Sequence, residues 1–530
     1  MPDADVVIIG SGAAGVSAAV PLIESGLSVL MIDGGIEPER EIPDSSLYDI
    51  RTNAGEQWKM FVGERFQALR TDVPSSPKFR APTNAYVFDR YGELYRARTS
   101  GFSLVGSLAA GGLTNAWGAA VSCYSREDLA DYPVSLADLE PSYRSVARRI
   151  GVSGSDSDDL APVLGTDIPL QPPTVLDENA ARLFARYTRN PGPARRHGVT
   201  IGRPHHAVLT EDRHNRQACN QATTCIWGCA RRAIYSARHD LETLKQRDRF
   251  HYRGHMFVEA LIPHETGATL RIRPLDGSSP FEHRAAVIIL ACGTIGSGKL
   301  VLEALDLFDH NAHFLSSPTV GFALWLPDRI GAAVSKEAFG LTQLSYTVSA
   351  GDDGLAFGNL FGTDGLLMSE FMRYLPATRP SAIRLMKLLG PSLLLGNCFM
   401  PGRFSDHSLS VHADGSLHIR GGYREELSHF VHEVQRRLAR MFIRYGLLVL
   451  PGSFTLTSPG EDVHYAATVP MSGTPEPGKS SPTGEVYGLP GVYVADGAAL
   501  SALPAKEHTF TIMANADRIA RGLAGRLEST

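Results

Sequence analysis

The sequence predicts an α/β fold in which a parallel sheet is interleaved with a second, α+β domain built on an antiparallel sheet. Short apolar runs at residues 6–9, 285–291 and 492–495 have the composition of parallel strands that are buried on both faces. Residues 310–455 contain alternating strands instead, as expected of an antiparallel sheet. The chain has 530 residues, which is too long for one ordinary core, so we expect two domains.

The first apolar run leads into a glycine loop, a helix and a second strand that ends at an acid. Gly10 allows a tight turn, Gly12 lets backbone N–H groups approach a phosphate, and Gly15 lets the helix lie close to the strand. The helix N-terminus offers N–H groups and a partial positive charge to an anion. Asp33 can accept hydrogen bonds from ribose hydroxyls. This order predicts a dinucleotide site rather than a glycine-rich turn without function.

The following residues predict further elements around this unit. Pro21 is expected to kink the first helix. Residues 36–100 have few periodic signals and are expected to form an excursion over the first domain. Residues 111–118 form a second glycine-rich stretch suited to backbone contact with a flat or anionic ligand, although its Trp117 could equally anchor the core. A helix is predicted to start at the N-cap Ser135, with Asp138 in its first turn.

The middle of the chain turns to β structure. Residues 153–175 predict a surface connection. Strands are expected at residues 255–260, 269–272 and 285–293, followed by a helix at 296–305. Within 310–455, the pattern predicts strands at 408–412 and 416–419 and a long amphipathic helix at 425–445. The last predicted helix covers residues 508–523.

Composition limits the class of protein. The net charge is −5, from 51 basic and 56 acidic residues without a basic block, so we expect no nucleic-acid partner. No apolar run is long enough for a transmembrane segment. The most apolar stretch, residues 382–400, predicts a buried helix and strand, or alternatively a surface that meets an apolar or lipid-linked substrate. The first strand begins at once, without room for a signal peptide, so we expect a cytoplasmic protein.

Six cysteines suggest a reducing compartment and no disulfide framework. Cys219, Cys225 and Cys229 form a cluster, but a metal site would need a fourth ligand, such as Cys123, Cys398 or His214. We expect a packed, metal-free loop there.

Two histidines flank the last predicted strand: His464 precedes it and His508 follows it. Imidazoles are well suited to moving protons near neutral pH. In combination, these features resemble the glucose–methanol–choline (GMC) oxidoreductase family, nearest to its sugar and gluconate branch. The similarity is carried by residues 10–33, 111–118, 287–297, 464–471 and 487–514.

The resemblance implies a Rossmann-like FAD-binding domain and oxidation of an alcohol to a carbonyl. It places His464 near flavin N5, through the family's His-x-x-Gly-Thr-x-x-Met motif, and His508 about 44 residues further on as the second catalytic group. It also implies that Val258 contacts the adenine through its backbone and that Asp496 and Thr509 lie on the flavin side. The complete set of expected cofactor-binding residues is Gly10, Gly12, Ala13, Ala14, Gly15, Asp33, Gly34, Gly112, Thr114, Trp117, Gly118, Val258, Asp496, Gly497 and Thr509.

The sequence departs from the family pattern at three positions. Ala467 replaces the family glycine, so the loop after His464 is expected to differ. Trp117 stands where many members have Asn. Ala116 stands where some members carry a histidine joined covalently to FAD, so we expect non-covalent FAD.

The predicted FAD-binding domain comprises residues 1–45, 100–150, 200–310 and 456–530, and the substrate domain with its cap excursions comprises 46–99, 151–199 and 311–455. The expected reaction is hydride transfer from a small-molecule alcohol, such as a sugar, glycoside or polyol, to flavin N5 while a histidine takes the hydroxyl proton. O₂, a quinone or a protein would accept the electrons. Two alternatives stay open: a lyase that uses the histidines as acid and base with structural FAD, and a non-catalytic FAD-binding protein.

Overall fold

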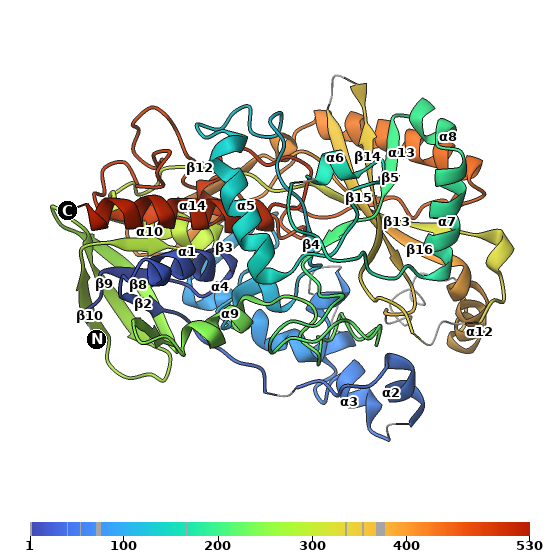
Figure 1. The fold of residues 1–530 in the computed structure, drawn as a ribbon, viewed down its shortest axis with the longest axis horizontal. Coiled ribbons are helices and arrows are strands. Elements are labelled where there is room, and N and C mark those ends of the chain that lie inside the picture. The colour runs from blue at the N-terminus through green and yellow to red at the C-terminus, as the bar shows by residue number, and fades with distance from the viewer. Residues whose placement is uncertain are drawn as a thin grey trace.

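The computed structural model describes residues 3–39, 41–53, 55–69, 76–165, 167–333, 337–351, 354–366 and 377–529. A parallel sheet lies toward one end of the long axis and an antiparallel sheet toward the other (Figure 1). Both chain ends lie on the side of the parallel sheet.

The parallel sheet has five strands in the order β21-β11-β1-β2-β7. Their bounds are β1 Val6–Ile9, β2 Val29–Ile32, β7 Phe250–Arg253, β11 Ile288–Leu290 and β21 Val492–Val494. Side chains alternate between the two faces, and both faces are buried, which explains why the strands are apolar throughout. The strands predicted at the beginning and end of the chain are therefore confirmed, and they lie in one sheet.

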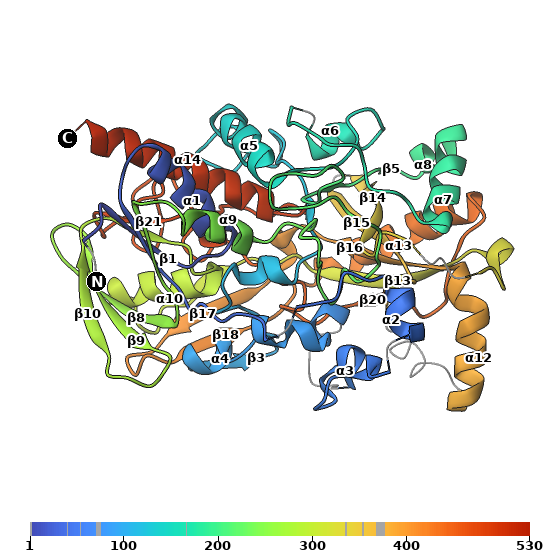
Figure 2. The ribbon, with the colours of Figure 1, turned by 60° about the horizontal axis from the view of Figure 1, so that its bottom comes forward.

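Three helices cover one face of this sheet: α1 Ala13–Glu24, α5 Leu136–Ile150 and α14 Thr509–Glu528. Figure 2 shows α14 alongside α1 and α5. The N-cap predicted at Ser135 is confirmed, and Asp138 forms a capping box with it, in which Ser135 N–H donates to Asp138 Oδ2 at 2.8 Å. Pro21 lies in the last turns of α1, which continues to Glu24.

The opposite face is covered by α10 Thr294–Ala304 and a three-stranded antiparallel sheet of β8 Met256–Pro263, β9 Ala268–Pro274 and β10 Phe281–Ala285. A four-stranded sheet follows in the order β12-β17-β18-β3. Its strands are β3 Ala97–Ser100, β12 Ala312–Phe314, β17 His407–Val411 and β18 Leu417–Arg420. The strands predicted in these regions are confirmed, with boundaries shifted by a few residues.

The antiparallel sheet has the order β19-β13-β16-β15-β14-β5, and β20 also pairs with β13. Its strands are β5 Val199–Gly202, β13 Thr319–Trp325, β14 Thr342–Ser349, β15 Leu355–Gly362, β16 Leu393–Phe399, β19 Leu448–Val449 and β20 Thr455–Leu456. The helices α7 Glu178–Arg189 and α13 Glu426–Arg444 pack against it. Residues 200–202 thus pair with this sheet, although the predicted FAD-binding domain includes them. The other predicted domain boundaries stay a prediction.

Shorter elements connect the sheets. They are α2 Leu47–Asn53, α3 Gln57–Phe61, α4 Tyr91–Leu94, β4 Ala120–Val121, α6 Ala161–Leu164, α8 Gly192–Arg196, β6 His205–His206, α9 Ala237–Leu244 and α12 Arg379–Leu389. The prediction of a surface connection at 153–175 is wrong around α6, because Leu160 and Leu164 are buried against Phe357.

The prediction of a buried helix within residues 382–400 is also wrong. Ile383, Leu385 and Leu388 of α12 are exposed, whereas strand β16 is largely buried as expected. Within the described part of the chain, no helix is both long and apolar enough to cross a membrane.

Candidate active site

One cavity of about 570 Å³ lies between the parallel and the antiparallel sheets. With the exception of Gly15, all the residues predicted to bind the cofactor line it, and both predicted catalytic histidines do so as well. Gly15 acts in packing, because a Cβ at this position would lie 1.9 Å from the Gly10 carbonyl oxygen. Segments that are far apart in the sequence thus meet at one place.

The glycine loop forms one end of the cavity. Gly10 has φ +103°, and a Cβ there would lie 2.4 Å from the Ala291 carbonyl oxygen, so only glycine fits between β1 and β11. No side chain caps Gly12 at the start of α1, and the first turn contains no acid. A Cβ on Gly12 would meet no atom within 4 Å, which leaves the N–H groups of the helix open toward the cavity. This end suits an anionic group such as a pyrophosphate.

Asp33 lies beside that loop, and its carboxylate already accepts hydrogen bonds from other residues of the protein. Its Oδ2 accepts from the Ser11 hydroxyl at 2.6 Å and the Tyr252 hydroxyl at 3.0 Å, and Oδ1 accepts from Ser11 N–H at 3.2 Å. Burial raises the pKa of Asp33 against the effect of these hydrogen bonds. Ser11, which the sequence analysis did not select, also accepts from Gly111 N–H at 2.9 Å and so joins the two glycine-rich loops.

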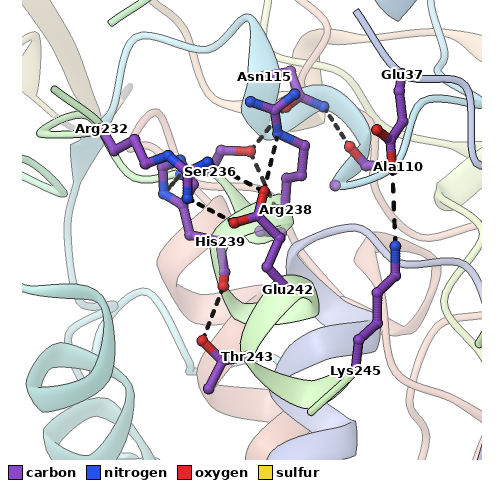
Figure 3. A network of polar contacts seen from close by, with 12 residues as sticks. Glu37, Ala110, Asn115, Arg232, Ser236, Arg238, His239, Glu242, Thr243 and Lys245 are labelled. Carbon is purple, nitrogen blue, oxygen red and sulfur yellow. Dashed lines mark hydrogen bonds and ion pairs between the residues drawn. The ribbon is translucent and has the colours of Figure 1, made fainter. Parts of the chain in front are cut away.

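The second glycine-rich loop is fixed by α9 (Figure 3). Ser236 donates to Asn115 Oδ1 at 2.8 Å, and Asn115 Nδ2 donates to the Ala110 carbonyl at 2.8 Å. Thr114 accepts from Ala237 N–H at 2.9 Å. The loop is thereby held against the first glycine loop: a Cβ on Gly112 would lie 3.2 Å from the Gly12 Cα. The two glycines therefore allow the two loops to come into close contact.

Trp117 has both of the roles considered for it. Its indole N–H donates to the Tyr235 carbonyl at 2.8 Å and its ring packs on the core, while another part of the side chain lines the cavity beside Gly118. Val258 and Gly34 line the opposite wall.

His464 lies in a segment that is anchored to the residues after β21. Ala467 N–H donates to the Gly497 carbonyl at 3.0 Å, and Ala466 pairs with Leu315. The backbone N–H of His464 donates to Asp462 Oδ1 at 2.8 Å. The neighbours Val463 and Ala467 both have left-handed backbones, with φ of 62° and 70°. The loop after His464 therefore takes a glycine-like conformation although Ala467 is not glycine.

His508 is the residue that precedes α14, and its position is fixed by the two residues before it. Lys506 forms a buried ion pair with Asp128. Glu507 accepts from Asn359 Nδ2 of β15 at 2.9 Å, and the Glu507 carbonyl accepts from the Ser122 hydroxyl at 3.1 Å. These contacts connect the start of α14 to the antiparallel sheet.

The two imidazoles are neighbours. Their ring centroids are 4.8 Å apart at an interplanar angle of 65°, and Phe399 packs 4.6 Å from the His464 ring. Both Nδ1 atoms are buried without a hydrogen-bond partner among the described residues. Burial lowers the pKa of His508 to about 4, and burial together with His508 and Lys78 holds the pKa of His464 well below its usual value. Both rings are therefore neutral at pH 7 and able to accept a proton.

Asp496, Gly497 and Thr509 lie between these histidines and the parallel sheet. Asp496 Oδ2 accepts from the Ser297 hydroxyl at 2.6 Å and from Gly293 N–H at 2.8 Å. Burial raises the pKa of Asp496 to about 6 despite these donors. A Cβ on Gly497 would lie 2.7 Å from the Tyr465 carbonyl oxygen, so the glycine allows the His464 segment to approach.

Several residues of the cavity have no signal in the sequence. Asn359 and Asn397 are cross-strand neighbours on β15 and β16, and Lys78 comes from the region without periodic signals. Glu507 and Asp462 stand one and two residues from the predicted histidines, and that proximity could have identified them. Burial raises the pKa of Asp462 to about 7.

The cysteine cluster lies outside this site. All six cysteines are free thiols, and Cys219, Cys225 and Cys229 are half-buried. Among the residues that the structure describes, no group of three or more His, Cys, Asp or Glu side chains could hold a metal ion.

Comparisons with known proteins match a segment at each end of the chain to a family model. The model described as GMC oxidoreductase matches residues 423–516, and the model described as FAD binding domain matches residues 5–37. The chain is 25% identical to paromamine 6'-oxidase of Streptomyces fradiae over 99% of this chain and 92% of that protein. It is 28% identical to the large subunit of fructose dehydrogenase of Gluconobacter japonicus, over 30% of this chain and 29% of that protein.

Solved structures share the whole fold. Pyridoxine 4-oxidase from Mesorbium loti aligns with a TM-score of 0.61 at 14% identity, over 98% of this chain and 99% of its own. A formate oxidase aligns with a TM-score of 0.62 at 11% identity, over 99% of both chains. These matches support an FAD-dependent member of the GMC oxidoreductase family. The fold combines an FAD-binding domain with a second domain on an antiparallel sheet.

The residues that line this cavity suit FAD. The open N-terminus of α1 can hold the pyrophosphate, and the absence of side chains at Gly12 and Gly112 lets the two glycine-rich loops approach each other beside it. Asp33 keeps lone pairs on Oδ1 beside its bond from Ser11. The cavity then extends to the two histidines, where an alcohol would have to lie.

Proposed function

We propose that this GMC oxidoreductase oxidises a hydroxyl group of a sugar, glycoside or related polyol to a carbonyl. The observation that carries the proposal is the pair of neutral imidazoles, 4.8 Å apart, in the cavity that the glycine loop of β1 also lines. FAD, when bound, supplies the hydride acceptor at N5.

His464 takes the hydroxyl proton in this proposal. A general base must be neutral to accept a proton, and its lowered pKa keeps His464 neutral at pH 7. His508 donates a hydrogen bond to the same oxygen and fixes the direction of the carbinol carbon. Its position depends on the two residues before it. Lys506 forms an ion pair with Asp128, and Glu507 accepts a hydrogen bond from Asn359.

We propose that FAD binds along the cavity, with its pyrophosphate at the glycine loop and its flavin near Thr509. The free N–H groups of α1 would bind the pyrophosphate, Val258 the adenine through its backbone, and Gly118, Asp496 and Thr509 the flavin end. Attachment is proposed to be non-covalent, because Ala116 carries no nucleophilic side chain. Acid precipitation that leaves the yellow colour in the protein pellet would contradict this.

A sugar-like substrate is supported by the polar wall of the cavity and by two relatives. Asn359 N–H donates to Asn397 Oδ1 at 3.1 Å, and both amides line the cavity near the Glu507 carboxylate. Amide and carboxylate groups suit a molecule with several hydroxyls. The names of two relatives, paromamine 6'-oxidase and fructose dehydrogenase, point in the same direction. A cytoplasmic location stays a prediction from the sequence.

The decisive experiment mixes the purified, FAD-loaded protein anaerobically with a panel of sugars, glycosides, polyols and simple alcohols. An oxidised substrate bleaches the visible flavin band, and the carbonyl product is identified by mass spectrometry. A lyase would consume its substrate without bleaching, and that result would overturn the proposal. Re-oxidation of the bleached protein by O₂ or by a quinone then identifies the electron acceptor.

A further inference from the structure

Lys78 is the one cation among the described residues that line the cavity. The other charged residues of the wall are carboxylates: Asp33, Glu461, Asp462, Asp496 and Glu507. Asp33, Asp496 and Glu507 accept hydrogen bonds from protein donors. The ammonium group of Lys78 has no hydrogen bond or ion pair with any described residue.

The position of Lys78 is fixed by its backbone. Its carbonyl accepts from Asn84 Nδ2 at 3.0 Å, and the same amide donates to the Ile226 carbonyl at 3.0 Å. Asn84 is buried, so this link between two segments is shielded from water. The side chain extends from this anchor into the cavity until Nζ lies 3.3 Å from the site of a Cβ on Gly118.

A cation that is partly removed from water and has no partner is stabilised by a nearby anion. Burial lowers the pKa of Lys78 to about 8, so it still carries its charge at pH 7. Its field also acts on the His464 ring, so the charge lies close to the catalytic pair. Since no described residue supplies an anion to Lys78, its charge is available to a molecule bound near His464 and Gly118.

We propose that Lys78 neutralises the negative charge that FAD gains when it is reduced. The inference rests on the proposed function, because it requires the flavin end of FAD to lie between Gly118 and His464. When a hydride leaves the carbinol carbon, two electrons and one proton enter the flavin, and the hydroxyl proton goes to His464. The flavin thus gains one negative charge while the alcohol becomes a neutral carbonyl, and the ammonium of Lys78 favours this product electrostatically.

Sulfite provides a test that needs no substrate. The sulfur lone pair of sulfite forms a bond to N5 of oxidised FAD, so the adduct brings a negative charge to the flavin and bleaches its visible band. Lys78→Met is expected to weaken sulfite binding by about tenfold or more. The midpoint potential is expected to fall by about 30 mV, which corresponds to tenfold for a two-electron couple. Lys78→Arg retains the charge and should keep both values near those of the wild type.

The controls separate this inference from the proposed function. Lys387→Met removes a charge from the exposed helix α12 and should change neither value. Lys78→Gln serves as a second uncharged variant if the Met variant folds poorly or loses FAD. Equal sulfite affinity and midpoint potential in the wild type and in the folded, FAD-loaded uncharged variants would overturn the role of Lys78. Failure of the wild type to bind FAD, or to be bleached by any alcohol, would instead contradict the proposed function.

Discussion

His464 is held between two residues in strained backbone conformations. Val463 and Ala467 have φ of 62° and 70°, a region that costs a non-glycine residue about 1–2 kcal/mol and is rare for a β-branched side chain. Hydrogen bonds from Ala467 to Gly497 and between Ala466 and Leu315 maintain the loop. Strain of this kind often accompanies functional sites. Here it turns the His464 segment toward the cavity.

Replacing Val463 by Asn is expected to raise the free energy of unfolding by about 1 kcal/mol, because Asn tolerates the left-handed region. Urea unfolding measures the change. Val463→Ala is the matched control, since it shortens the side chain without gaining that tolerance. Equal stability of the Asn and Ala variants would show that the backbone conformation costs little.

His464→Ala is expected to slow anaerobic flavin reduction by about 100-fold or more while FAD stays bound. Stopped-flow absorbance measures the reduction, and the visible spectrum reports the bound FAD. His432→Ala on the exposed side of α13 is the control and should react like the wild type. Unchanged reduction in the His464 variant would refute its assignment as the base.

The pH dependence of flavin reduction should follow the lowered pKa values of the two histidines. Burial lowers the pKa of His508 to about 4 and holds that of His464 well below its usual value. A base is active above its pKa, so at saturating substrate the rate constant should fall only at a pH well below 6.5. A decline centred near pH 6.5 would indicate an imidazole that is not buried.

At the scale of elements, the start of α14 depends on one buried ion pair. Lys506 is 3% exposed and pairs with Asp128, and the next two residues are Glu507 and His508. The ion pair therefore fixes the loop that precedes α14, and with it the position of the His508 side chain in the cavity.

Lys506→Met is expected to lower the free energy of unfolding by about 3–5 kcal/mol, because it leaves Asp128 buried without its partner. The double variant Lys506→Met/Asp128→Leu removes both charges and should recover most of the loss. Denaturant unfolding of the wild type, the single variant and the double variant measures both effects. A double variant no more stable than the single one would mean that the lysine acts through packing.

Elements that depend on local pattern could be predicted from the sequence, whereas those that depend on distant partners could not. The capping box at Ser135 and the helix α13 follow from spacing within one segment. The membership of β5 in the antiparallel sheet and the exposure of α12 depend on tertiary contacts, and both were missed. In the site, the resemblance supplied the histidine pair, but no local signal identified Asn359 or Lys78.

At the scale of the whole molecule, one cavity joins the two sheets. Gly10 and Gly12 line it from the parallel sheet, and Asn359, Asn397 and Phe399 line it from the antiparallel sheet. A molecule bound there touches both domains at once, so binding and stability are coupled.

Removing FAD is therefore expected to lower the melting temperature. Free FAD at about 100 times its Kd should restore about 2.7 kcal/mol of stability. Thermal unfolding with and without added FAD measures this. Riboflavin, which lacks the pyrophosphate and adenine, is the control and should stabilise less because it cannot contact the open end of α1. Equal melting temperatures with and without FAD would contradict the coupling.

The pairing of β21 with β11, and of α14 with α1, also affects how the protein matures. A ribosome releases β1 and α1 first, but the partners of α1 and β11 are residues 492–528, which emerge only after the entire antiparallel sheet. The nascent nucleotide fold thus stays open throughout translation, with apolar surface available to chaperones. Because residues 492–528 complete the parallel sheet and its helix layer, we expect flavin to bind only after synthesis has finished.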